Sequence, residues 1–253
     1  MTAFLSRRLL LRSGLGGMTI GAVATLAACS STSESDAEAT AEGAEQDGDS
    51  AAQSATAAPA SSWERVNLGF VSAYVFVRGG QAAVVDAGTQ GSQDDIEAVL
   101  AGLDVGWEDV SDVILTHSHP DHIGSAAAIA QAAADAAFHA GEGDLSAIDI
   151  GRDVMGLRDG DSVFDLSIIA TPGHTPGHVC VHDRVNGVLV AGDALTGAQG
   201  GVDLPNPEFT PEYEEALRSV DYLGTFDFET ALFGHGEPVS EGAAEQVRGL
   251  SLG

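Results

Sequence analysis

The chain has 253 residues, contains no lysine, and carries 10 basic against 38 acidic residues, which gives a formal net charge of −28 at pH 7. Phosphate binding needs a basic surface, so this charge weighs against nucleic acid as substrate or partner. The two cysteines are Cys29 and Cys180. A structural disulfide is not expected, because Cys29 is expected to carry lipid, for the reasons given next, and Cys180 suits a small core position.

Residues 1–28 have the features of an export signal. An apolar stretch at residues 14–28 is too short to span a membrane and suits the hydrophobic region of a signal peptide. Residues 6–12, which include an arginine pair, resemble a twin-arginine signal, and Leu26-Ala-Ala-Cys29 resembles a lipobox. These resemblances imply cleavage before Cys29, lipid on its sulfur, and a lipoprotein on the outer face of the cytoplasmic membrane. The alternative is a soluble protein with a chance arginine pair.

Residues 29–62 are predicted to form a lipid-anchored, acidic and disordered linker. From residue 30 onward this segment contains no Val, Leu, Ile, Met or aromatic residue, so it cannot bury enough apolar surface to offset chain entropy. The 191 residues from 63 to 253 suit a single domain with a sizeable core. Loss of the signal leaves 7 basic against 38 acidic residues, a net charge of −31.

Strands and helices are mixed along the predicted domain. Residues 63–86 predict three short strands, interrupted near Gly69 and at Arg78-Gly-Gly80, and an apolar pattern at helical spacing predicts a helix over 94–103. Asn186-Gly187 is a strong hairpin signal. Further strands are predicted at 110–116, 162–170, 178–183, 188–192 and 231–233, and an alanine-rich helix at 124–136.

Two further helices are predicted near the C-terminus. Thr210 has the features of an N-cap, with Pro211 at the first helical position and three glutamates in the first turn. Ser240 is predicted to open a closing helix. The segment 200–207, rich in glycine and proline, is expected to overhang the functional site.

Residues 116–122 read Thr-His-Ser-His-Pro-Asp-His and follow directly on the predicted strand 110–116. Imidazole and carboxylate are the ligands of borderline divalent metals, zinc above all. Because one metal open to substrate rarely uses four such donors, this cluster suggests two adjacent metals. Further donors close later predicted strands, namely His174 in the segment 171–178, Asp193 after 188–192, and His235 after 231–233.

This ordered set resembles the metallo-β-lactamase superfamily, in which an HxHxDH motif is followed by a His, an Asp and a His at strand ends. The early segment Val84-Val-Asp-Ala-Gly88 fits the same pattern, and the resemblance covers roughly residues 63–253. It implies an α/β fold, the four-layer αββα sandwich, with the site along one edge between the sheets.

The resemblance also implies a site for two Zn²⁺ ions, with other divalent metals possible. Asp193 would bridge the ions, and a hydroxide between them would be the nucleophile. Asp121 would be both a ligand and the candidate catalytic residue. The implied ligands are His117, His119 and His174 for one metal and Asp121, His122 and His235 for the other.

Four more residues are expected to have supporting or unrelated roles. Asp86 is expected to hydrogen-bond loop backbone near the site, and His178 to orient the loop 171–178. His139 is expected to be a surface or hydrogen-bonded residue, as is His182, which is expected to face a hairpin turn.

The implied activity is hydrolysis of a small activated acyl compound, namely a thioester, lactone, β-lactam or ester. Only 18 residues follow His235, which disfavours glutathione thioesters, whereas the retention of His122 and Asp193 lies closer to lactonases than to β-lactamases. One alternative is an iron dioxygenase acting on persulfides, with His117, His174 and Asp193 as ligands. Another is a non-catalytic zinc-binding surface lipoprotein.

Overall fold

The computed structural model describes residues 61–250. The predicted signal peptide, the lipidation site Cys29 and nearly all of the predicted linker lie outside these residues. Within the described part, no helix is long and apolar enough to cross a membrane.

The first half of the described chain builds a six-stranded sheet. Its strand order follows the chain, β1 to β6, and pairing is antiparallel up to β3 and parallel from β3 to β6. The strands are β1 (Ser61–Asn67), β2 (Ser72–Arg78), β3 (Gln81–Val85), β4 (Val110–Leu115), β5 (Ala137–Gly141) and β6 (Met155–Leu157).

The second half builds a five-stranded sheet in the order β13-β10-β9-β8-β7, and β11 and β12 form a separate hairpin. Pairing is antiparallel except between β10 and β13. These strands are β7 (Ser162–Val163), β8 (Leu166–Ala170), β9 (Val179–Asp183), β10 (Val188–Val190), β11 (Thr196–Ala198), β12 (Gly201–Asp203) and β13 (Thr230–Leu232).

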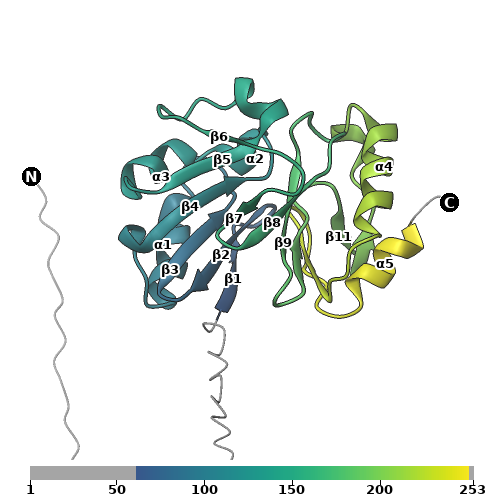
Figure 1. The fold of residues 1–253 in the computed structure, drawn as a ribbon, viewed down its shortest axis with the longest axis horizontal. Helices are drawn as coiled ribbons and strands as arrows, with labels where there is room; N and C mark the ends of the chain where they lie inside the picture. Colours follow the sequence, from purple (N-terminus) through teal and green to yellow (C-terminus); the bar gives the residue numbers. More distant parts are fainter. Residues whose placement is uncertain (1–60, 251–253) are drawn as a thin grey trace, which may run out of the picture. The chain divides into compact units, whose positions relative to one another are not determined.

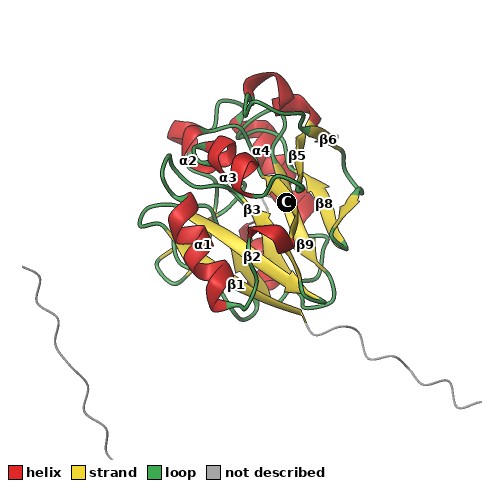
Figure 2. Cartoon of the chain, turned by 90° about the vertical axis from the view of Figure 1, so that its left-hand side faces the viewer, coloured by secondary structure: helices red, strands yellow, loops and turns green. Residues whose placement is uncertain are grey.

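Helices cover the outer face of each sheet (Figures 1 and 2). The first sheet carries α1 (Gln93–Gly102) and α3 (Ala126–Ala132), and the second carries α4 (Tyr213–Leu223) and α5 (Ala243–Leu250). A short α2 (Pro120–Ile123) follows β4. The 3-10 helices are η1 (Trp107–Asp109), η2 (Glu142–Ala147) and η3 (Pro207–Phe209).

Three apolar clusters within residues 61–250 separate these layers. One lies between the two sheets and includes Tyr74, Ile114 and Ile168. The other two lie between each sheet and its helices. In strand β9, alternate residues contribute to different clusters. Val179 and Val181 face the other sheet, whereas Cys180 faces the helices. The predicted αββα sandwich is confirmed, and Cys180 is a buried core residue.

Two predicted elements are wrong in extent. The predicted strand 162–170 is a hairpin of β7 and β8, because Phe164 and Asp165 adopt positive φ angles of 55° and 58° and reverse the chain. The predicted helix 124–136 begins only at Ala126 and ends at Ala132. Gly124 lies where the chain passes close to other backbone, since a Cβ there would lie 2.5 Å from the nitrogen of Gln90.

The predicted cap of the next helix is also wrong. Helix α4 begins at Tyr213 with Glu212 before it, and the Thr210 hydroxyl instead donates a hydrogen bond to the carbonyl of Asn206 at 2.8 Å. The closing helix begins at Ala243 rather than Ser240. Thr210 is therefore available for a contact in the site.

Hydrogen bonds join the two sheets along the edge where strands end. The nitrogen of Val179 donates to the carbonyl of Thr116 at 2.9 Å. The buried Tyr74 hydroxyl donates to the carbonyl of Phe233 at 2.7 Å and accepts from the nitrogen of the same residue at 3.1 Å. These contacts hold the loops after β4, β8 and β13 in one place.

Candidate metal centre

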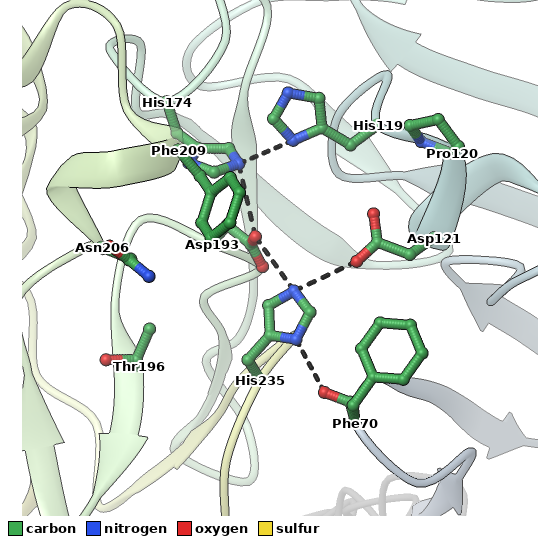
Figure 3. A pocket seen from close by; sticks show the side chains of 10 residues that line it. All are labelled: Phe70, His119, Pro120, Asp121, His174, Asp193, Thr196, Asn206, Phe209 and His235. Atoms are coloured by element: carbon green, nitrogen blue, oxygen red, sulfur yellow. Dashed lines mark hydrogen bonds and ion pairs between the residues drawn. The ribbon is translucent and has the colours of Figure 1, made fainter.

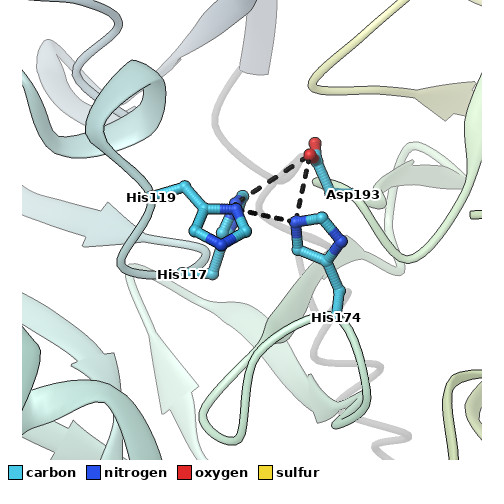
Figure 4. A group of neighbouring side chains, drawn as sticks. All are labelled: His117, His119, His174 and Asp193. Carbon is cyan, nitrogen blue, oxygen red and sulfur yellow. Dashed lines mark hydrogen bonds and ion pairs between the residues drawn. The ribbon is translucent and has the colours of Figure 1, made fainter. Parts of the chain in front are cut away.

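The seven predicted ligands lie together as two neighbouring groups. Within each group, one nitrogen or carboxylate oxygen per residue lies within 4.8 Å of the others. Figure 4 shows the first group, in which three rings and one carboxylate converge. The first group is His117, His119, His174 and Asp193, and the second is Asp121, His122 and His235.

Both halves of the sandwich supply donors to each group. The loop after β4 carries two histidines, and α2 carries Asp121 and His122. The remaining donors follow strands of the second sheet, with His174 after β8, Asp193 after β10 and His235 after β13. The strand-to-loop transitions therefore place all of them at the same edge.

Hydrogen bonds fix which nitrogen His117 presents to the group. The Thr116 hydroxyl lies 2.8 Å and 3.0 Å from the two oxygens of Asp86, an acceptor-only carboxylate, so it donates its proton there. It therefore accepts from Nδ1 of His117, at 3.1 Å. The lone pair of His117 is left on Nε2, which faces the other donors.

His174 is oriented in the same way by Thr210. The Thr210 hydroxyl donates to the carbonyl of Asn206 and so accepts from Nδ1 of His174 at 3.2 Å, which leaves the lone pair on Nε2. His119 instead presents Nδ1, which lies 2.9 Å from Nε2 of His174 and 3.1 Å from Nε2 of His117. A single proton cannot satisfy three such nitrogens, whereas a cation accepts all three lone pairs, so the residues fit a metal.

In the second group, His122 and His235 are anchored through Nδ1. His122 donates to Asp86 at 2.8 Å and His235 donates to the carbonyl of Phe70 at 2.7 Å. Nε2 of His122 and Oδ1 of Asp193 lie 3.3 Å apart, and in the described part of the chain both are buried without a hydrogen-bond partner. Buried polar atoms of this kind are normally satisfied, so they also fit a bound cation.

Asp193 contacts both groups. Its Oδ2 lies 3.3 Å from Nε2 of His174 and 3.3 Å from Nε2 of His235. Burial raises the pKa of its carboxyl, but the imidazoles of His122 and His235, each 3.3 Å away, outweigh burial and hold the pKa well below its usual range. Asp193 is therefore an anion between the two groups at neutral pH.

The histidines of the two groups differ in charge. Burial lowers the pKa of His117 well below its ordinary value and that of His174 to about 4, so both rings are neutral at pH 7. Hydrogen bonds to Asp121 and Asp193 raise the pKa of His235 to about 10. Without metal, positive charge is therefore held on the second group, where a cation would replace a proton.

Asp86 and His178 have the supporting roles expected of them, and each makes one additional contact in the site. Asp86 accepts from the nitrogen of Thr116 at 2.7 Å, as predicted for a loop-binding carboxylate, and it also holds His122. His178 contacts the Thr171 hydroxyl through Nδ1 at 2.8 Å and accepts from the nitrogen of Asp193 at 3.0 Å. It thereby orients its own loop and the backbone of a ligand.

Asp144 is a site residue that sequence reasoning missed. Its buried carboxylate accepts from the nitrogens of Ser118 and Gly177, at 2.8 and 2.7 Å, and from the hydroxyl of Thr175 at 2.7 Å. It therefore ties the loop that carries His119 to the loop after β8. No local pattern around Asp144 marks this role, because its partners lie far away in the sequence.

Besides His178, two further histidines lie outside both groups. Nε2 of His139 pairs with Asp112 at 2.8 Å, which confirms a hydrogen-bonded role. His182 is buried in β9 on the helix side, with its ring edge-on to Phe226 and Phe228. The expectation that it faces a hairpin turn is wrong, because β9 pairs with β10 through His182 and places the ring in the core.

A cavity of about 490 Å³ opens over the donors. From the segment 200–207, expected to overhang the site, Asn206 contributes to the wall. Figure 3 shows Phe209 on the His174 side of Asp193. The lining residues are Phe70, His119, Pro120, Asp121, His174, Asp193, Thr196, Asn206, Phe209 and His235.

Fold and site together define an αββα protein with a histidine- and aspartate-rich site for divalent metal. The family described as the metallo-beta-lactamase superfamily matches residues 66–235, and the chain belongs to that superfamily. Its members are mostly hydrolases, and the chain is hydrolase-like in this sense.

Among curated proteins, the uncharacterized protein YobT of Bacillus subtilis is 28% identical over 198 residues, which cover 66% of this chain and 83% of that protein. The hydroxyacylglutathione hydrolase of Bdellovibrio bacteriovorus is 30% identical over 157 residues, or 60% of this chain and 57% of that enzyme. That of Pseudomonas fluorescens is 32% identical over 159 residues, or 60% and 55%. The chain thus spans about half the length of these two hydrolases.

Solved structures share the fold. The metallo-beta-lactamase family protein TTHA1429 from Thermus thermophilus superposes with a TM-score of 0.58 at 24% identity, covering 75% of this chain and 78% of that one. The metallo-beta-lactamase SMB-1 gives a TM-score of 0.59 at 19% identity, with coverage of 74% and 89%. At these identities the likeness concerns the fold alone.

Proposed function

We propose that this protein is a metal-dependent hydrolase of a small activated acyl compound: a thioester, lactone, β-lactam or ester. The observation that carries the proposal is the pair of donor groups that meet at Asp193, with four histidines anchored through the nitrogen that faces away. Two divalent cations, with zinc the first choice, would be held by His117, His119, His174 and Asp193 and by Asp121, His122, His235 and Asp193.

Bound there, the cations would supply Lewis acidity that polarises an acyl carbonyl and lowers the pKa of water toward neutrality. The remaining roles in the proposed reaction fall to side chains of the protein. Asp193 and Asp121 offset part of the positive charge, and His178 holds the Asp193 backbone in place. Thr196 and Asn206 are polar side chains of the cavity wall outside both donor groups, and they can hydrogen-bond a substrate heteroatom.

The comparisons support acyl hydrolysis. The curated relatives with a named activity include hydroxyacylglutathione hydrolases, and an enzyme so named cleaves a thioester. These relatives favour glutathione as the thiol part, although the chain spans only about half of their length. Thioesters therefore stay in the proposed class, and the thiol part has to be decided by assay.

The site favours this proposal over two alternatives. An iron dioxygenase with a single metal would leave Asp121, His122 and His235 as a complete second donor group without a role. A zinc-sequestering protein would not need the cavity that leads from the donors to solvent. Both observations favour a substrate site above two metals.

Elemental analysis and a substrate screen test the proposal. Protein purified from metal-replete cells should contain about two zinc ions per chain, and Asp121→Ala should lower this to about one, while His139→Asn should not change it. Ester, thioester, lactone and chromogenic β-lactam substrates should reveal turnover. One metal in both wild type and Asp121→Ala would refute the two-metal site, and two metals without turnover on any substrate would refute the hydrolase.

We further propose that the protein works as a lipoprotein on the outer face of the cytoplasmic membrane. The support is the arginine pair, the short apolar stretch and the lipobox-like end at Cys29. Lipid on Cys29 would anchor the domain through the acidic linker, so the site would act on small molecules outside the membrane.

A further inference from the structure

Two exposed aromatic side chains frame the candidate metal centre. Phe70 is 66% exposed and Phe209 is 63% exposed, yet both line the cavity. Phe70 lies between β1 and β2, and its ring stacks on His235 with centroids 6.0 Å apart at 13°. Phe209 ends η3 and lies on the His174 side of Asp193, whereas Phe70 lies beyond His235 (Figure 3). Large apolar side chains left open on either side of a site have surface to offer a substrate.

Within residues 61–250, no cationic side chain besides the metal-facing histidines lines the cavity. The sequence has no lysine, and none of the arginines in residues 61–250 lines the cavity. Arg65 reaches the residue after His235, but it donates to the carbonyl of Gly236 at 3.0 Å, to Ser72 at 2.9 Å and to Glu237 at 2.7 Å. Its guanidinium is therefore engaged by the protein itself.

The exposed aromatic side chains and the lack of a free cationic side chain at the cavity together indicate a substrate specificity. We propose that the cavity selects uncharged acyl substrates with an apolar arm and discriminates against a carboxylate on that arm. A carboxylate held against Phe70 or Phe209 would lose hydration without gaining a partner. The net charge of −28 adds a repulsive field for anions. This inference rests on the proposed function, and it narrows the proposed substrates to those whose acyl arm carries no carboxylate.

A matched pair of esters tests the selectivity of the metal-loaded, full-length protein. p-Nitrophenyl hexanoate and mono-p-nitrophenyl adipate share the scissile bond, the leaving group and the number of acyl carbons, and differ in a terminal carboxylate. We expect kcat/KM to be at least about tenfold higher for hexanoate. From acetate to hexanoate it should rise by up to about fourfold per methylene. High salt screens the overall charge, so a preference that persists there comes from the cavity walls.

Substitutions at one wall should change the preference. Phe209→Ala should flatten the dependence of kcat/KM on acyl length, and Phe209→Arg should shift the hexanoate-to-adipate ratio toward adipate by about tenfold or more. Val185 is a matched control, because it is 71% exposed and does not line the cavity. Val185→Arg adds the same charge and should leave the ratio unchanged.

A binding measurement separates this inference from the proposed function. Hexanohydroxamic acid and its terminal carboxylate analogue can be titrated calorimetrically into the metal-loaded protein, and the uncharged-arm ligand should bind at least about tenfold more tightly. Preferential binding without turnover of either ester, or of any other substrate in the screen, would uphold the selectivity and refute the hydrolase. Hydrolysis with equal kcat/KM for both esters, or a hydroxamate pair with equal affinity, would overturn the selectivity and leave the hydrolase standing.

Discussion

Asp86 belongs to neither donor group in the described part of the chain, yet its replacement by asparagine should weaken metal binding. The carboxylate is buried and accepts hydrogen bonds from the nitrogen and hydroxyl of Thr116 and from Nδ1 of His122. Asparagine keeps the shape but has one acceptor oxygen, so its amide group must face a donor. Asp86 has a φ of 64°, a conformation that asparagine also tolerates, and the backbone is therefore not the source of the effect.

The size of the effect follows from what His122 loses. Without an acceptor at Nδ1, the ring is free to carry its proton on Nε2, the atom that lies 3.3 Å from Asp193. A protonated Nε2 cannot bind a metal. Loss of such an outer partner costs about 10–100-fold in metal affinity, and an unpaired buried donor costs about 1–3 kcal/mol of stability. We expect the second metal equivalent of Asp86→Asn to bind at least about tenfold more weakly.

Competition with a chromophoric zinc chelator measures the two affinities, and urea unfolding of the metal-free protein measures stability. Asp112→Asn is the matched control, because Asp112 pairs with His139 at the same 2.8 Å outside both donor groups. It should leave both metal affinities unchanged. The reasoning is refuted if Asp86→Asn binds both metals as the wild type does, or if Asp112→Asn loses as much.

Three further outcomes are expected. Asp193→Asn should fold, as circular dichroism can confirm, but should lower turnover by at least about a hundredfold because the anion between two dications is lost; near-normal turnover, or an equal loss in His139→Asn, would contradict the assigned site. Burial raises the pKa of Cys180 to about 12, so its thiol should resist iodoacetamide at pH 8 in the native protein and react in urea, with labelling mapped by mass spectrometry. Full-length protein should fractionate with membranes and Cys29→Ala with the soluble fraction, and soluble behaviour of both would exclude the lipid anchor.

The donor positions could be predicted because each donor follows an apolar run, and that pattern is local. The supporting residues could not. Tyr74 and Phe233 are 159 residues apart, and Asp144 accepts from Ser118 and Thr175 at separations of 26 and 31 residues. A buried carboxylate and a buried hydroxyl find such partners only through the fold, and nothing in the neighbouring sequence indicates them.

Local signals also failed where tertiary contacts outweighed them. The run 162–170 contains no glycine, but Phe164 and Asp165 adopt left-handed backbone and divide it into β7 and β8. Thr210 precedes Pro211 as an N-cap would, yet its hydroxyl is used by Asn206 and His174. The loss of a cap at α4 is compatible with the function of Thr210 in orienting a donor.

Each donor group takes side chains from both halves of the sandwich, from the loop and α2 after β4 on one side and from the strand ends of the second sheet on the other. A cation in either group would therefore cross-link the halves, and a complete set of donors exists only once the halves have come together. Metal binding is then coupled to folding, and the compartment in which the chain folds determines which metals are available to it. Under the proposed twin-arginine route, which carries folded proteins, that compartment is the cytoplasm, and the protein would reach the outer face of the membrane with its metals already bound.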